Sequence, residues 1–372
     1  MPVAEKEKGR DSNFELLRIF AMLGIIFHHL QQHGIWFAAG SSFSVPFLLS
    51  HFFQAWVGMI CNWIFVLISG YFICKASFSW KKFFLLWFQV FSISALLTVI
   101  ALLAKVPVVT NQQLYEEKGF LVAAHPVTAK DALRFFMPCY FGNNWFAVAY
   151  LVFYLFVPFL NLFLKHLPQK EHRQLLVLMA VLGLLVKQLP FQGFFLPDTL
   201  FLFMLGYFSA AYIRLYNPPF MNHTKLNVAF ALACCGVFIA WNGLVYTVLI
   251  PIPFVERHLQ EVAGFWGGGM PRVLSFLCAL LIFCSVKNLH IPRNSFINKV
   301  ASCTFGVYLF HENLLVNKYL WHVLLRSDEF SSSKFLLVYM ICASILVFAL
   351  CTVLELVRKQ LLEKPMQKLI AG

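Results

Sequence analysis

The sequence contains few charged residues, and this scarcity excludes an ordinary soluble protein. Asp, Glu, Lys and Arg make up 12% of its 372 residues, whereas 60% of the residues are hydrophobic and the mean hydropathy is +0.75. A soluble globular domain carries about twice this share of charge. Phe alone accounts for 43 residues, which suits a surface in contact with lipid. The composition indicates an integral membrane protein.

The sequence predicts neither a cleavable leader nor a disulfide framework. The first apolar stretch, which starts at residue 13, is too long for the core of a signal peptide and lacks a small-residue cleavage site. Most of the ten cysteines fall inside apolar stretches, where Cys behaves as a small apolar residue. We see no soluble catalytic domain at either end, so we expect any chemistry to use the membrane helices and their loops.

Apolar stretches of about 17–25 residues, the length that a bilayer requires, follow one another along the chain. They predict an all-α, polytopic membrane bundle of about ten helices over residues 13–360. A disordered cytoplasmic tail at 1–12 and a cytoplasmic C-terminal tail at 361–372 are expected to flank it. The predicted spans are 14–36, 54–74, 81–104, 145–166, 173–189, 198–216, 226–250, 270–286, 299–322 and 335–358.

The net charge of +13 comes from 29 Lys and Arg against 16 Asp and Glu. In a soluble protein this excess would suggest a nucleic-acid partner. Here, if the N-terminus is cytoplasmic, most of the basic residues fall in the tails and short loops of the inner side, as the positive-inside rule demands. We therefore predict a protein of the cell membrane with cytoplasmic N- and C-termini. No nucleic-acid partner is predicted.

Two ionisable residues stand on one face of the first predicted helix. Arg18 and His29 are eleven residues apart, which places them on the same stripe at a separation of roughly 16 Å. Glu15 lies one turn before Arg18, close enough to pair with it. A lone buried His usually bonds a neighbouring carbonyl, but charged and ionisable residues on one stripe of a membrane helix indicate a functional site. We predict a polar cavity in which neutral His29 acts as a general base.

The ninth predicted span carries a second polar stripe. Thr304, Tyr308 and His311 fall at i, i+4 and i+7 of a helix, and Glu312 adjoins that face. The alternative to a catalytic role is a hydrogen-bond network between helices. Because adjacent side chains diverge by about 100° on a helix, we expect Glu312 to orient a group other than His311, either His29 or a substrate hydroxyl.

Other polar residues mark the ends of predicted helices. Lys81 and Lys82 begin the third helix, where they either bind phosphates or only anchor the helix at the inner surface. Asn144 and Trp145 open the fourth helix and suit a sugar, although an interfacial Trp is the simpler interpretation. Ser69, near the end of the second helix, is assigned to substrate binding or to helix packing. No metal site is predicted.

Four segments of the chain resemble the acyltransferase-3 family of integral membrane acyltransferases. The resemblance covers essentially the whole chain and includes the expected number of helices. Its motifs are Asn13–Ile19 with His28 and His29, Phe65–Tyr71, the set Trp145, Tyr150, Pro158 and Asn161, and Thr304–His311.

The resemblance implies that Arg18 and His29 are the essential pair of the first helix. It also implies an acyl-coenzyme A donor, usually acetyl-CoA, supplied from the cytoplasm, and an acceptor hydroxyl on a sugar of a surface polysaccharide. Many members have two arginines at the start of the third helix. This chain has Lys81 and Lys82 there, and lysine is a point charge rather than a bidentate donor.

We therefore predict a membrane O-acyltransferase that moves an acetyl group from acetyl-CoA to a sugar hydroxyl of a cell-surface or lipid-linked glycan. Arg18, Lys81 and Lys82 would hold the donor, and Tyr308, Ser69 or His311 would donate to the oxyanion. A secondary transporter of a glycan or a small anion is the main alternative, although the two halves show no repeat. A non-catalytic partner in polysaccharide assembly is the third interpretation.

Overall fold

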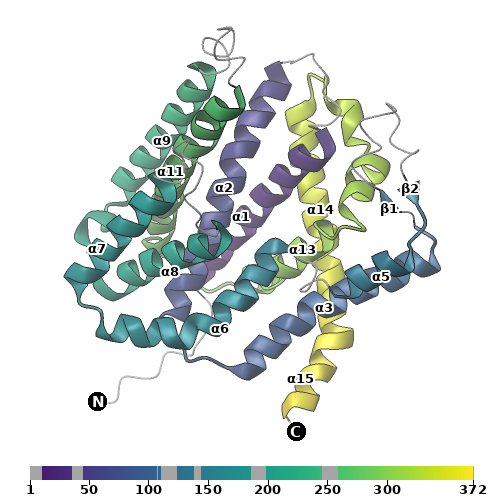
Figure 1. Ribbon diagram of the computed structural model, residues 1–372, viewed down its shortest axis with the longest axis horizontal. Helices are drawn as coiled ribbons and strands as arrows, with labels where there is room; N and C mark the ends of the chain where they lie inside the picture. Colours follow the sequence, from purple (N-terminus) through teal and green to yellow (C-terminus); the bar gives the residue numbers. More distant parts are fainter. Residues whose placement is uncertain are drawn as a thin grey trace.

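The computed structural model describes residues 11–35, 45–106, 108–109, 124–137, 144–185, 198–244 and 259–371. Nearly all of these residues are helical (Figure 1). Helices α1 and α2 lie in the middle of the molecule, with α7, α8, α9 and α11 on one side and α3, α5, α13 and α14 on the other. The all-α bundle expected from the sequence is confirmed.

The long helices follow the apolar stretches of the sequence. Their bounds are α1 Ser12–Leu30, α2 Val45–Ile73, α3 Trp80–Leu103, α6 Trp145–His166, α7 Gln169–Ala180, α8 Asp198–Tyr216, α9 Thr224–Leu244, α11 Leu259–Lys287 and α14 Leu336–Arg358. The shorter elements are β1 Val108–Val109, β2 Ala124–His125, α5 Ala129–Phe136, α12 Ser295–Ala301, α13 Thr304–His311 and α15 Lys364–Ala371.

Seven helices in the described part of the chain are long and apolar enough to cross a bilayer. Their outward faces carry large apolar side chains, such as Phe159 on α6 and Leu232 on α9, which are 69% and 67% exposed. A soluble protein rarely exposes so much apolar surface to water, whereas lipid chains solvate it. The chain is a multi-pass membrane protein.

The ninth predicted span, 299–322, is wrong as a continuous helix. The helix is interrupted by a turn at Ser302 and Cys303, between α12 and α13, and α13 ends at His311. Side-chain hydroxyls compete for backbone carbonyls at the break, because Ser302 Oγ donates to Lys299 and Thr304 Oγ1 donates to Ala301.

Two other predicted spans differ from single crossing helices. Of the predicted span 173–189, residues 173–185 belong to α7 and to a π-helical turn at Val181–Leu185, and residues 186–189 lie outside the described residues. Helix α7 begins with the polar sequence Gln-Lys-Glu-His-Arg. Residues 270–286 are only the second half of α11. Neither is among the seven crossing helices of the described residues.

The structure describes the predicted C-terminal tail but little of the predicted N-terminal tail. Residues 1–10 of the predicted N-terminal tail lie outside the described residues, and α1 already starts at Ser12. At the other end, α14 continues through a π-helical turn into α15, so Leu336–Leu369 forms one helix of 34 residues. The predicted C-terminal tail is therefore helical as far as Ala371.

Asn161 of α6 connects the turn between α2 and α3 with α8. Its Nδ2 donates to the carbonyls of Ile73 and Ala76, at 3.2 and 3.0 Å, in the turn between α2 and α3. Tyr207 on α8 donates to Asn161 Oδ1. The Asn161 amide therefore reaches across from α6 to this turn and not to a carbonyl of its own helix.

Candidate active site

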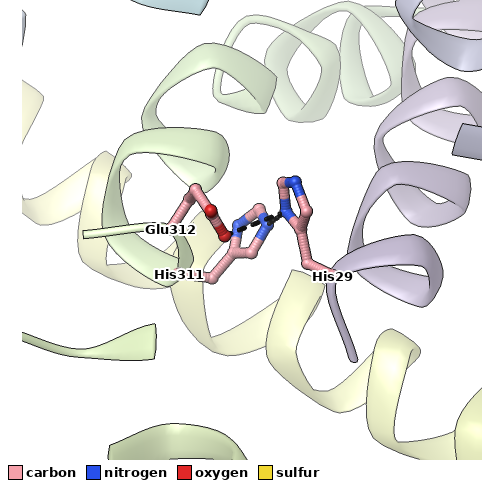
Figure 2. Close-up of side chains that lie close together, drawn as sticks. All are labelled: His29, His311 and Glu312. Carbon is pink, nitrogen blue, oxygen red and sulfur yellow. Dashed lines mark hydrogen bonds and ion pairs between the residues drawn. The ribbon is translucent and has the colours of Figure 1, made fainter. Parts of the chain in front are cut away.

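Three ionisable side chains meet between α1 and α13. Figure 2 shows the His311 imidazole and the Glu312 carboxylate, both from the end of α13, directed toward the His29 ring on α1. His29 Nδ1 lies 2.9 Å from His311 Nε2 and 3.2 Å from Glu312 Oε2. Of the two groups that we expect Glu312 to orient, His29 or a substrate hydroxyl, the structure places His29 beside it.

The neighbours of His311 determine which nitrogens carry protons. His311 Nδ1 lies 2.6 Å from the carbonyl oxygen of Val307, which only accepts, so Nδ1 of His311 carries the hydrogen. In the neutral ring Nε2 is then an acceptor, and the donor of the 2.9 Å contact is Nδ1–H of His29. His29 Nε2 is left with a lone pair. Among the described residues, neither His311 nor Glu312 contacts this Nε2 atom of His29.

Glu312 divides its two oxygens between two histidines. Oε2 faces His29, and Oε1 lies 3.2 Å from Nε2 of His33. His33 belongs to the π-helical turn Gln31–Ile35 that continues α1. This residue was missed at the sequence level, although its position four residues after His29 is a visible signal, because i and i+4 share a helix face.

A cavity of about 250 Å³, here called the central cavity, opens beside His29. Arg18, Met22, Ile25 and His29 contribute to its wall from α1, at a spacing of i, i+4, i+7 and i+11. The expected common face of Arg18 and His29 is thus present. Arg18 also pairs with Glu15 at 2.5 Å, as its position one turn later predicts.

A second cavity, the Lys82 cavity, borders the central cavity at Arg18. It has a volume of about 460 Å³ and shares Arg18, Leu86 and Tyr150 with the central cavity. Lys82 lies in its wall, whereas Lys81 lines none of the cavities described. The sequence treated the two lysines alike, but neighbouring residues on a helix point about 100° apart, and only one faces the opening.

The predicted substrate-binding residues separate into two groups. Ser69 on α2, Trp145 on α6 and Tyr308 on α13 line the central cavity. The Tyr308 hydroxyl is buried and has no hydrogen-bond partner among the described residues. Asn144 is different, since it is buried at the start of α6 and lines neither the central cavity nor the Lys82 cavity.

The sequence comparison matches residues 11–356 with the acyltransferase-3 family, whose profile is described as an acyltransferase domain. The chain belongs to the acyltransferase-3 family. No curated protein and no solved structure matches it. The resemblance seen in four motifs is therefore confirmed, and family membership makes the protein a membrane acyltransferase.

Further polar residues of this acyltransferase surround the central cavity. Asn62, seven residues before Ser69 on α2, and Gln89 on α3 both lie in its wall. Gln89 Nε2 donates to Glu355 at 2.9 Å, and Glu355 is fully buried and bonded to Arg358. The sequence analysis missed these residues because isolated amides in apolar helices give no periodic signal.

The cluster around His29 also has the composition of a metal site. The ligand atoms of His29, His311 and Glu312 lie within 4.8 Å of one another, and two histidines with one carboxylate are a ligand set used by zinc. His311 Nδ1 bonds a backbone carbonyl, as ligating histidines often do. His29 and His311 also bond each other directly, whereas Oε2 of Glu312 has no hydrogen-bond partner among the described residues. The sequence-based expectation of no metal remains a prediction.

Proposed function

We propose that this acyltransferase is an O-acetyltransferase of the cell membrane. It moves an acetyl group from acetyl-CoA, supplied from the cytoplasm, to a sugar hydroxyl of a cell-surface or lipid-linked glycan. The observation that carries the proposal is the position of His29, whose Nδ1 contacts His311 and Glu312 while the residue lines a cavity that shares Arg18 with the Lys82 cavity.

The entrance suits an anionic donor with a long arm. Arg18 and Lys82 both line the Lys82 cavity and supply positive charge for the phosphates of coenzyme A. The central cavity then receives the pantetheine arm, which is long compared with the roughly 16 Å between Arg18 and His29 along the helix. The thioester reaches His29 while the nucleotide stays at the entrance.

The chemistry requires one base and one donor to the oxyanion. His29 Nε2 takes the proton of the acceptor hydroxyl as the oxygen attacks the thioester carbonyl, a contribution of about 10²–10⁴-fold. The C–S bond breaks, and the proton passes from His29 to the departing thiolate, which gives the ester and free coenzyme A. Tyr308 or Ser69 donates to the oxyanion. His311 is unsuited to this task because its Nε2 accepts from His29.

Replacement of the base tests the proposal directly. His29→Ala should abolish transfer of radiolabelled acetyl from acetyl-CoA to a polysaccharide acceptor, while insertion in the membrane and binding of coenzyme A persist. His28→Ala is the matched control, since His28 packs against Gly58 and does not line the central cavity. Assays with and without a chelator should agree. Near-normal transfer by a folded His29→Ala protein would refute the proposal.

A further inference from the structure

A third cavity adjoins the central cavity on the side away from Lys82. It has a volume of about 320 Å³ and shares Asn62 and Trp145 with the central cavity. Residues of α2, α6, α8 and α11 form its wall. Because Arg272 of α11 is the charged residue of this wall, we name it the Arg272 cavity.

Arg272 lies deep in the apolar part of the bundle. It precedes Lys287, the last residue of α11, by fifteen residues, which is roughly 22 Å along the helix. The hydrocarbon core of a bilayer is about 30 Å thick. A guanidinium at such a depth is costly unless it faces water or a partner, and residues of this kind mark substrate pathways.

The shape of the guanidinium suits an anionic ligand. Arg272 makes another interaction within the protein, but its side chain has five N–H donors in a planar arrangement. This geometry matches the two oxygens of a carboxylate or a phosphate. The remaining wall of the cavity includes the indoles of Trp63 and Trp145 and the polar side chains of Asn62 and Thr199, a mixture that suits a sugar ring with its apolar face and its hydroxyls.

We propose that the Arg272 cavity binds the acceptor and that the acceptor is an anionic glycan, with a carboxylate or a phosphate near the hydroxyl that is acetylated. The inference rests on the proposed function, which it extends to a class of acceptor. The anionic group binds Arg272, the sugar lies against Trp145, and its hydroxyl enters the central cavity toward His29. Arg18 and Lys82 bind the donor from the opposite side.

Equilibrium binding to the full-length protein in lipid nanodiscs tests this assignment without any transfer step. The probes are cellobiose, the matched acid in which one glucose is a glucuronic acid, and a short glycerol-phosphate oligomer. The wild-type protein should bind at least one of the anionic probes about 10–100-fold more tightly than cellobiose, the range for a charge-assisted hydrogen bond. Which anionic probe binds identifies a sugar carboxylate or a phosphodiester as the source.

Two arginine variants make the test specific to the cavity. Arg272→Gln should remove the preference for the anionic probe and retain coenzyme A binding, which also shows that the variant folds. Arg18→Gln should weaken coenzyme A binding and retain the preference. Equal binding of all probes to the wild-type protein, or an unchanged preference in Arg272→Gln, would overturn the inference. A preference that depends on Arg272 in a protein that transfers no acetyl would support the inference and count against the proposed function alone.

Discussion

The two nitrogens of His29 have different surroundings. Nδ1 is held by His311 and Glu312, and the proton on it is specified by a chain of contacts that ends at the carbonyl of Val307. Nε2 is left as the basic atom. An imidazole fixed in one tautomer and one orientation does not have to reorganise before it accepts a proton, and this is the advantage of a carboxylate–histidine pair.

Loss of the Glu312 charge should affect the rate far more than binding. In Glu312→Gln the side chain keeps its shape but no longer stabilises the protonated His29, so kcat should fall by about 10²–10⁴-fold with little change in KM for the donor. Steady-state kinetics with acetyl-CoA measure both constants. His33→Asn is the control, because His33 contacts the other oxygen of the same carboxylate. A fall of similar size in both variants would indicate that the network is only structural.

Tyr308 offers a test of the oxyanion donor. Its hydroxyl is buried without a partner among the described residues and lines the central cavity. Tyr308→Phe should lower kcat by about 10²–10³-fold, the usual effect of removing one such donor. The thermal midpoint should stay constant because no hydrogen bond within the described fold is lost. An unchanged kcat would transfer this role to Ser69.

At the scale of helices, the close packing of α13 against α14 positions the end of α13 that carries His311 and Glu312. A side chain at Gly306 would collide with the carboxyl group of Glu355, so glycine permits the two helices to pack closely. Glu355 is fixed in turn by Arg358, at 2.7 and 2.8 Å, and by Gln89 on α3. Lys359 Nζ donates to Ser302 at the break before α13. Together these contacts determine where α13 places His311 and Glu312.

Gly306→Ala should therefore lower the stability of the protein by about 1–3 kcal/mol, since the added methyl group must displace a buried, fully bonded side chain. Thermal unfolding in detergent, followed by light scattering or dye binding, measures the shift of the midpoint. Gly236→Ala on α9 is the control, because an added Cβ there meets nothing within 4 Å. In a helix it should leave stability unchanged or raise it slightly.

The sequence alone allowed prediction of most helices and of the common face of Arg18 and His29 on α1. The apolar stretches and the eleven-residue spacing of Arg18 and His29 are local features, and local features of a helix determine which side chains share a face. Contacts between distant helices are different. The pairing of His29 with Glu312 was only one of two alternatives, and Gln89 with Glu355 gave no pattern at all. The break at Ser302 was missed because hydroxyl groups stabilise a turn as well as a helix.

For the whole molecule, the order of the three cavities implies a direction for the reaction. The central cavity shares Arg18 and Tyr150 with the Lys82 cavity, and Asn62 and Trp145 with the Arg272 cavity. A donor and an acceptor that enter from opposite ends meet at His29 without passing each other. This arrangement agrees with a cytoplasmic donor and an external acceptor only if the protein has the orientation predicted from its basic residues.

Topology reporters test this orientation. Fluorescent protein fused after residue 372 and a short tag placed before residue 1 should both be cytoplasmic and protected from protease added outside intact cells. A tag inserted between Leu103 and Trp145 should be cleaved under the same conditions, since the positive-inside rule places that connection outside. Cleavage of the terminal tags would reverse the assignment of donor and acceptor entrances.

The joined helix formed by α14 and α15 is longer than the membrane is thick. Its 34 residues span roughly 50 Å at 1.5 Å per residue, against about 30 Å of hydrocarbon. If it stands perpendicular to the membrane, this rod extends about 20 Å beyond the hydrocarbon core and passes through the headgroup region. A soluble domain joined in helical register to this rod would turn with the protein as one body, which gives electron microscopy a rigid alignment marker on a membrane protein of 42.7 kDa.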